Sequence, residues 1–173
     1  MKKFIDGMIH SLKEKALSKC NEVVDRQVQY VELKQVKSCL AFSTADEEGK
    51  KVVAYLAKRL GNVKVDKLYV VEEETDMIET DDLVLLRKED LSFGGKIRNE
   101  YLEAMCRRKY DLAVDLTMLT TPVAKYVFSH TKASLIAGMK KEGNGADLVV
   151  EPVEHVTDFV NKLVRILGDI KKG

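Results

Sequence analysis

Carboxylate and hydroxyl side chains follow two of the most apolar runs in the chain, and such side chains can take part in catalysis or bind a ligand. The first run is VKSCLAF and the second is DLAVDL. A carboxylate at the end of such a run can act as a general base or accept hydrogen bonds from ligand hydroxyls. It can equally satisfy backbone N–H groups of the turn that follows. The set comprises Ser43, Thr44 and Asp46 after the first run, and Asp115, Thr117, Thr120 and Thr121 at and after the second.

Asp46 and Asp115 are the candidates for a catalytic base, but structural roles are favoured for both. Asp46 stands before a helical pattern, where capping and stabilisation of the helix dipole are expected. Asp115 is expected to bond to backbone N–H groups of its own turn. Asp111, at the other end of the same run, is predicted to be a solvated turn residue. The residues therefore assign no catalytic group.

Phosphate-binding and metal-binding signatures are missing. SFGGK offers two glycines ahead of a helix, with Lys96 and Arg98 as candidate anion contacts, although an ordinary turn is the favoured alternative. Neither G-x-x-x-x-G-K-[ST] nor a G-x-G-x-x-G after the first strand occurs. The three histidines form no H-x-x-x-H pair, and G-x-S-x-G is absent. No metal site and no cofactor are predicted, and His130 is expected to cap its helix's C-terminus.

Strand-like and helix-like periods alternate along the chain, which predicts a parallel sheet with helices on both faces. The fold class expected is a three-layer α/β/α Rossmann-like domain with a mainly parallel sheet of five or six strands. Thr44 and Glu47 have capping-box spacing, and Thr121-Pro122 begins another helix. The segment 140–147 is expected to be a flexible loop. The predicted strands are 36–42, 67–71, 83–86, 111–116, 133–139 and 147–151.

The first 25 residues predict a separate amphipathic helix ahead of a single domain at 33–173. Its apolar stripe runs from Ile5 through Val23, and the first twenty residues carry a side-chain charge of about +3. Such a helix can lie on an anionic membrane surface, although packing on the domain or on a second copy is favoured. No export signal is recognised, and the cysteines are expected to be reduced core thiols. A cytoplasmic protein is expected, with peripheral contact of residues 1–20 with the inner membrane as the alternative.

The stretch YDLAVDLTMLTTPVAKYVFSHTKASLIAG, residues 110–138, resembles the N-terminal domain of lipopolysaccharide heptosyltransferases. The resemblance spans roughly residues 65–138 and implies a GT-B sugar transferase, whose catalytic aspartate follows a glycine. Here Ala45-Asp46 takes that place, and no second nucleotide-sugar domain fits in the chain. Over its whole length the chain is more similar to a short bacterial family of unknown function. Asp90, Leu91, Phe93 and Gly94, together with YDLAVDL, carry that similarity.

Two functions remain open from the sequence. The first is a non-catalytic α/β module that binds a protein partner or a small ligand at the carboxyl ends of its strands. The second is a small enzyme or enzyme subunit related to sugar transferases, acting on a sugar or an anionic molecule. The net charge of +1 argues against a nucleic-acid partner. A homo-oligomer stays open as an alternative.

Overall fold

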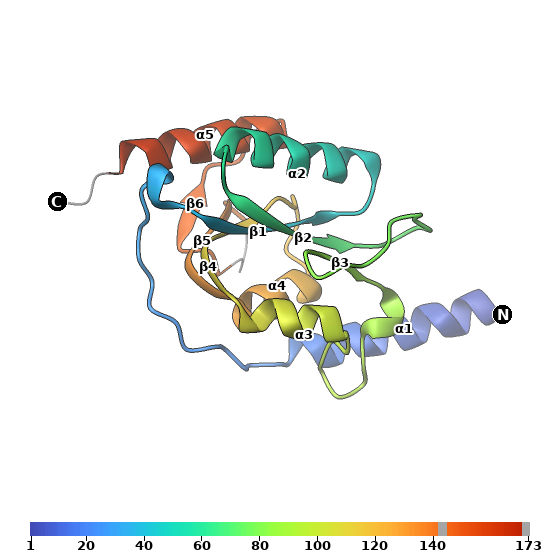
Figure 1. Cartoon of the computed structure of the whole chain (residues 1–173). Coiled ribbons are helices and arrows are strands. Elements are labelled where there is room, and N and C mark those ends of the chain that lie inside the picture. The colour runs from blue at the N-terminus through green and yellow to red at the C-terminus, as the bar shows by residue number, and fades with distance from the viewer. Residues whose placement is uncertain (142–144, 171–173) are drawn as a thin grey trace.

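A computed structural model describes residues 1–141 and 145–170 and contains one six-stranded sheet in which every neighbouring pair is parallel (Figure 1). The strand order is β3-β2-β1-β4-β5-β6. The order reverses between β1 and β4, so the loops leaving these two strands diverge and make room for a ligand. The strands are β1 (Ser38–Thr44), β2 (Lys64–Val70), β3 (Leu83–Leu86), β4 (Lys109–Asp115), β5 (Lys132–Met139) and β6 (Leu148–Val150).

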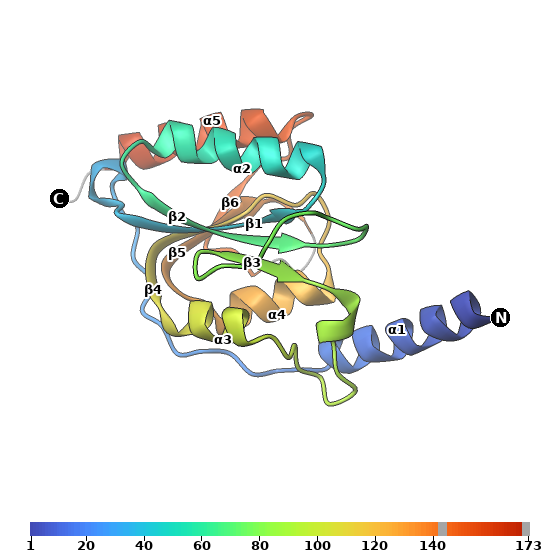
Figure 2. The same cartoon turned by 45° about the vertical axis from the view of Figure 1, so that its right-hand side comes forward.

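Helices cover both faces of the sheet, which confirms the three-layer α/β/α class (Figures 1 and 2). On one face α2 (Glu47–Leu60) and α5 (Val156–Asp169) bury aliphatic side chains together with Phe159. On the other face lie α3 (Glu100–Arg107), α4 (Pro122–His130) and Leu17 of α1 (Lys2–Ser18). The strands bury residues on both faces because each face is covered. Short 3-10 helices, η1 (Leu33–Gln35) and η2 (Lys88–Asp90), complete the described elements.

Two helix starts differ from the sequence prediction. The N-cap of α2 is Asp46, whose side chain accepts a hydrogen bond from Gly49 N–H at 2.7 Å, so the expected capping box at Thr44 is wrong. Thr44 stays in β1, because the sheet hydrogen bonds continue to that residue. The sequence places the next helix directly after SFGGK, but α3 begins only after Asn99, whose side chain accepts a hydrogen bond from Leu102 N–H as the N-cap. At α4 the predicted Thr121 cap is confirmed.

The leading helix ends five residues earlier than its apolar stripe, which continues to Val23. Beyond Ser18 the chain exchanges helical hydrogen bonds for bonds to the domain: Val24 N–H donates to the carbonyl of Ser129 at 2.7 Å. Gln29 N–H donates to the carbonyl of Ser134 in β5. The extended segment 19–32 therefore passes along the amino ends of the strands and carries the chain from α1 to η1 beside α5 (Figure 1). The apolar periodicity alone therefore predicts a longer helix than the structure contains.

The first half of α1 projects past the rest of the molecule (Figures 1 and 2). Only the end of the helix is anchored, through buried Leu17 and contacts with α4. Phe4, Ile5, Met8 and Leu12 leave large parts of their side chains exposed. Within the described residues no helix combines the length and the apolar character needed to span a membrane.

Candidate functional site

A cleft of about 440 Å³ opens at the carboxyl ends of β1 and β4, where the strand order reverses. Phe42 and Asp115 are opposite each other in the ladder between these strands, so the loops that follow leave from neighbouring positions. Ligands of open parallel sheets bind in such a crevice. Its walls include Phe42, Ser43, Thr44, Asp46, Val52, Val70, Glu72, Leu116, Thr117, Met118, Leu119, Thr121, Glu154, His155 and Val156.

Most of the hydroxyls expected at this edge do meet here. Ser43, Thr44 and Asp46 come from the β1–α2 connection, and Thr117 and Thr121 come from the β4–α4 connection. Thr44 and Thr117 thus lie on one rim of the sheet, as the parallel arrangement predicts. Thr120 belongs to the same loop but is not among the residues that line the cleft, and Asp115 lies beneath it.

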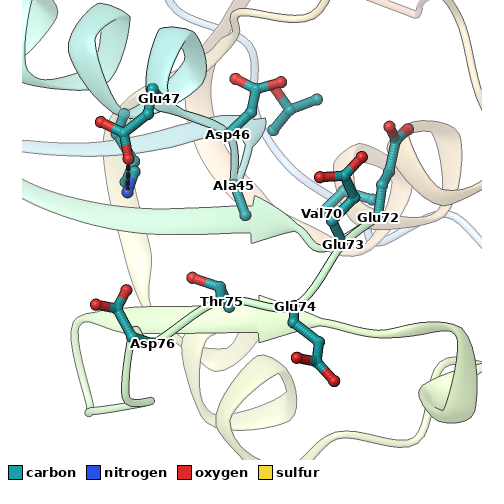
Figure 3. Close-up of a pocket in the computed structure, with 11 residues that line it drawn as sticks. Ala45, Asp46, Glu47, Val70, Glu72, Glu73, Glu74, Thr75 and Asp76 are labelled. Atoms are coloured by element: carbon teal, nitrogen blue, oxygen red, sulfur yellow. Dashed lines mark ion pairs between the residues drawn. The ribbon is translucent and has the colours of Figure 1, made fainter.

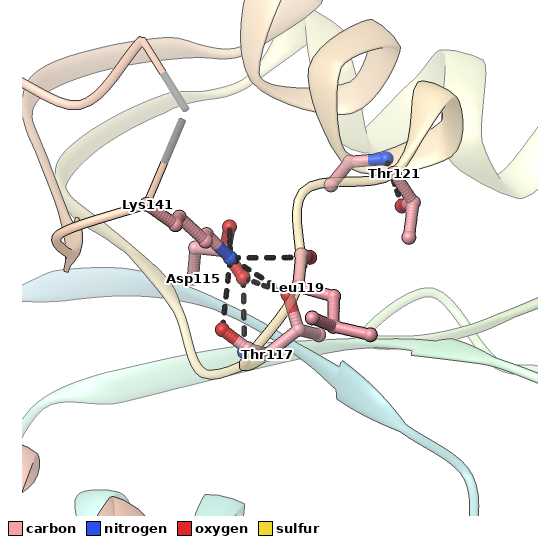
Figure 4. Close-up of polar contacts among 6 residues, drawn as sticks. Asp115, Thr117, Leu119, Thr121 and Lys141 are labelled. Carbon is pink, nitrogen blue, oxygen red and sulfur yellow. Dashed lines mark hydrogen bonds and ion pairs between the residues drawn. The ribbon is translucent and has the colours of Figure 1, made fainter. Parts of the chain in front are cut away.

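Asp115 is almost completely buried and is bonded through both carboxylate oxygens (Figure 4). Its Oδ1 accepts hydrogen bonds from Thr117 N–H at 2.9 Å and Thr117 Oγ1 at 2.6 Å. Its Oδ2 lies 2.7 Å from Lys141 Nζ, and the two side chains are only 5% and 8% exposed. The expected bond to the following turn is therefore present, and Asp115 fixes the floor of the cleft.

Lys141 is the residue of this site that sequence analysis missed. Its ammonium group also donates to the carbonyl and the hydroxyl of Thr117, at 2.8 and 3.0 Å (Figure 4). The prediction of a flexible loop at 140–147 partly falls outside the described residues, but Lys141 itself is fixed by these bonds. A lysine in the loop after a strand gives no periodic signal, so only the folded chain reveals its buried partner.

Close packing of α2 on β1 shapes the wall that carries Asp46. A Cβ at Gly49 would lie 2.0 Å from the carbonyl oxygen of Thr44 and 2.7 Å from its Oγ1. Ser43 Oγ also donates to the Gly49 carbonyl at 3.4 Å. Glycine at this position lets the first turn of the helix lie directly against the end of the strand. Asp46 completes that turn as the N-cap, so the structural role favoured from the sequence is present.

A second cavity of about 730 Å³ adjoins the cleft and is strongly acidic (Figure 3). The two share Thr44, Asp46, Val70 and Glu72. In the part of the chain that the structure describes, Lys50 is the one lysine or arginine that lines either cavity, and its Nζ lies 2.5 Å from Glu47. The hydrogen bond to Glu47 raises the pKa of Lys50, so this lysine stays charged and paired. The carboxylates lining the two cavities are Asp46, Glu47, Glu48, Glu72, Glu73, Glu74, Asp76 and Glu154.

The expected anion contacts do not reach this cleft. Lys96 and Arg98 are exposed but lie on the connection between η2 and α3, outside the lining of either cavity. The SFGGK turn instead packs on the end of α1: at Gly95, with φ of 74°, a Cβ would lie 2.8 Å from the Ala16 carbonyl oxygen. Lys13 of α1 places its ammonium group 5.3 Å from the centre of the Phe93 ring. The ordinary turn, the alternative favoured from the sequence, describes this segment.

Asp111 differs from its prediction as a solvated turn residue. It is half-buried, and its Oδ2 accepts hydrogen bonds from Lys37 N–H at 2.8 Å and Ser38 N–H at 3.2 Å. It thereby holds the start of β1 beside β4. The aspartates at the two ends of this apolar strand are thus both structural, one at each edge of the sheet.

A buried polar cluster near the amino ends of β2 and β4 was also missed. Asp66 Oδ2 accepts hydrogen bonds from Tyr110 Oη at 2.6 Å and Arg108 Nη1 at 2.8 Å, whereas Asp66 Oδ1 is buried without a partner. Burial, then the hydrogen bond to Asp66, raise the pKa of Tyr110 far above its usual value. The cluster joins two strands that flank β1, which indicates a structural role.

Neither of the two cysteines with a shifted pKa, Cys39 and Cys106, is activated as a nucleophile. Burial raises the pKa of the Cys39 thiol, and it raises that of Cys106 to about 11. Thiols with raised pKa values carry little thiolate near neutral pH and are weak nucleophiles. All three cysteines are free, as the sequence predicts, but only Cys39 is fully buried.

The fold and the switch-point cleft define a Rossmann-like α/β protein. More particularly, the chain belongs to a family of unknown function, DUF6913, whose profile matches residues 10–170. The match agrees with the resemblance to a family of unknown function and supplies no activity. No curated protein and no solved structure matches the chain, and the resemblance to heptosyltransferases gains no support.

Proposed function

We propose that this protein is a non-catalytic module that binds a small, positively charged organic molecule in the switch-point cleft. The observation that carries the proposal is the composition of the walls. Apolar side chains such as Val52, Leu116 and Leu119 line the cleft together with Asp46, Glu72 and Glu154, and no lysine or arginine of the described residues lines it. An amine with an aliphatic body fits both properties.

The charge of the site disfavours the anionic ligand that a sugar-transferase relationship implies. Phosphate groups usually bind at a helix N-terminus with free N–H groups and nearby cations. At α2 that position is occupied by the Asp46 cap, and Glu47 and Glu48 fill the first turn. The neighbouring acidic cavity strengthens the negative potential, which raises the local concentration of cations.

The two aspartates considered as a catalytic base are both engaged in this arrangement. Both oxygens of Asp115 are engaged with Thr117 and Lys141. Asp46 is exposed but serves as the helix cap. A general base needs a proton acceptor within hydrogen-bond reach of the substrate. Binding without turnover is therefore the function that this geometry favours.

Thermal unfolding with a panel of small molecules tests the proposal. Putrescine, spermidine and agmatine represent amines, whereas inorganic phosphate, UDP and glucose 1-phosphate represent anions, all at equal ionic strength. We expect an amine to raise the Tm by about 5–10 °C when present at a hundred times its Kd, and the anions to have no effect. Stabilisation by an anion alone would contradict the proposal and favour the sugar-transferase alternative.

Matched variants place the response in the cleft. Asp46→Asn removes a charge and retains a good N-cap, so its stability should stay close to that of the parent protein. Combined with Glu154→Gln, it should reduce amine affinity by roughly tenfold or more, because each lost contact with a charged group is worth about 1.5–3 kcal/mol before screening. Glu89→Gln, exposed on η2, is the control and should respond as the parent does.

The exposed face of α1 supports a second candidate function, contact with an anionic membrane surface. Phe4 and Met8 are 75% and 51% exposed on a helix that projects from the domain (Figure 2). Lys2, Lys3 and Lys15 are exposed on the same helix. An interfacial helix combines such an apolar face with basic residues that attract acidic lipids.

Co-sedimentation of the full chain with vesicles tests this second function. We expect binding to vesicles that contain phosphatidylglycerol, weakened by salt, and little binding to phosphatidylcholine alone. Phe4→Ser with Met8→Ser should lower binding at least tenfold, because burying each side chain is worth about 1.5–3 kcal/mol. Ile78→Ser, which alters another exposed apolar residue, is the control. Equal binding by both variants would refute membrane contact, and loss of a dimer in the α1 variant would identify a second copy as the partner.

A further inference from the structure

A thiol, a carboxylate and an imidazole from two distant segments meet beside the end of α1. Cys20 and Glu22 belong to the turn after α1, and His130 is the last residue of α4. Cys20 Sγ, a Glu22 carboxylate oxygen and a His130 ring nitrogen all lie within 4.8 Å of one another. Since 108 residues separate Glu22 from His130, no sequence motif shows the cluster. These are side chains that ligate transition metals.

The hydrogen bonds of His130 present its other nitrogen to the cluster. His130 Nδ1 lies 2.7 Å from the carbonyl oxygen of Tyr126, and because a carbonyl only accepts, Nδ1 carries the proton. Nε2 then faces Glu22 Oε2 at 3.4 Å. The ring also stacks on Tyr126, with centroids 4.0 Å apart. Metal-binding histidines commonly donate the second ring N–H to a backbone carbonyl in this way, which fixes the orientation of the ring.

The spacing of the His130 nitrogen and the Glu22 oxygen suits a small tetrahedral ion. With Nδ1 protonated, the lone pair of Nε2 faces the Glu22 carboxylate, and a cation can be bound between these two atoms. Two ligand atoms about 2.0–2.1 Å from a tetrahedral zinc ion lie about 3.3 Å apart. The observed separation of 3.4 Å between His130 Nε2 and Glu22 Oε2 matches this edge.

We propose that Cys20, Glu22 and His130 bind a divalent cation of the zinc class. A thiolate, an imidazole and a carboxylate suit Zn²⁺ or Co²⁺, whereas Mg²⁺ and Ca²⁺ prefer sites built from oxygen. Three protein ligands leave a fourth position for water, and the Glu22 side chain, 64% exposed, lies at the solvent side. Binding deprotonates the Cys20 thiol, so one proton is released per bound ion at a pH where the thiol is protonated.

The bound ion would fasten the turn after α1 to the end of α4. Backbone hydrogen bonds already guide this segment, from Cys20 N–H to the Leu17 carbonyl and from Val24 N–H to the Ser129 carbonyl. Three metal bonds add a cross-link between them and restrict the start of the segment 19–32. The site lies at the amino ends of the strands, where α4 ends, and the ligand cleft lies at their carboxyl ends, so the two proposals are independent.

Titration of the full chain, free of any affinity tag, with Zn²⁺ against a chelator of known affinity tests the proposal. We expect one ion per chain and a higher Tm in its presence. Co²⁺ should give a thiolate charge-transfer band and the intense visible bands of a tetrahedral site. Substitution of residues around a metal's ligands costs 10–100-fold in affinity, so Cys20→Ser or His130→Gln should each cost at least about 100-fold. Amide exchange at residues 19–24 should slow when the ion binds.

Two controls distinguish the cluster from general binding by cysteine or histidine. Cys106→Ser removes the other half-buried thiol, and His155→Gln removes an exposed imidazole elsewhere. Both should bind Zn²⁺ and Co²⁺ as the parent does. Unfolding curves of the metal-free variants establish that Cys20→Ser and His130→Gln are folded. Unchanged Zn²⁺ affinity in these two variants, or a cobalt spectrum without the thiolate band, would overturn the proposal.

Discussion

Replacing Lys141 by methionine should lower the free energy of unfolding by about 3–5 kcal/mol, because it leaves the Asp115 carboxylate buried without its counter-charge. Both side chains are almost inaccessible to solvent, so water cannot substitute for the lost ammonium group. The substitution also removes the hydrogen bonds to the Thr117 carbonyl and hydroxyl. Urea unfolding followed by circular dichroism measures the change, with the slope m checked for two-state behaviour.

A double-mutant cycle separates the ion pair from the volume of the side chain. Asp115→Asn with Lys141→Met removes both charges and retains an acceptor for Thr117, so the pair should show a coupling energy on the order of 2 kcal/mol. Lys140→Met is the matched control: its ammonium group is exposed and lies 3.6 Å from exposed Glu151, and its loss should change stability by less than about 0.5 kcal/mol. Similar effects of Lys140→Met and Lys141→Met would show that the buried pair contributes nothing particular.

Much of the sheet can be predicted from the sequence because its signals are local. Aliphatic runs such as 83–86 and 133–139 have no polar face, and this property belongs to strands covered on both sides. The sequence predicts one helix cap correctly and another wrongly. Thr121-Pro122 is unambiguous, whereas Thr44 and Asp46 compete for one helix start, and the sheet retains Thr44. The early end of α1 depends on hydrogen bonds to residues more than a hundred positions away, which no local pattern contains.

The site was predictable as a location but not in its electrostatics. Topology alone brings Thr44 and Thr117 to one rim, because parallel strands end at the same edge of a sheet. The positions of Lys96 and Lys141 could not be deduced in the same way. Lys96 was expected in the cleft, but it follows a turn that packs on α1 and lies elsewhere. Lys141 was not expected, and it forms an ion pair with Asp115 beneath the cleft. Both outcomes depend on tertiary contacts.

Gly49→Ala should both destabilise the protein and damage the cleft. The new methyl group would lie 2.0 Å from the backbone oxygen of Thr44, so the first turn of α2 must move away from the end of β1. Overpacking of this kind lowers the free energy of unfolding by about 1–3 kcal/mol and occasionally more. Alanine raises it by roughly 1 kcal/mol as the better helix former, and we expect the loss to be the larger of the two. Displacement of the turn moves Asp46 and Glu48 away from the opposite wall, so the thermal stabilisation by amines should fall together with the Tm.

Gly168→Ala is the control for this substitution, because it makes the same chemical change in α5, where no atom of residues 1–141 and 145–170 outside the helix's own backbone lies within 4 Å of the added methyl group. It should leave the Tm unchanged or raise the free energy of unfolding by about 0.5–1 kcal/mol, since alanine is the better helix former. Differential scanning calorimetry with and without spermidine measures both effects in one experiment. If Gly49→Ala changes the Tm and the response to spermidine no more than Gly168→Ala does, the first turn of α2 can move away from β1 without cost. The contact between α2 and β1 then does not determine the shape of the cleft.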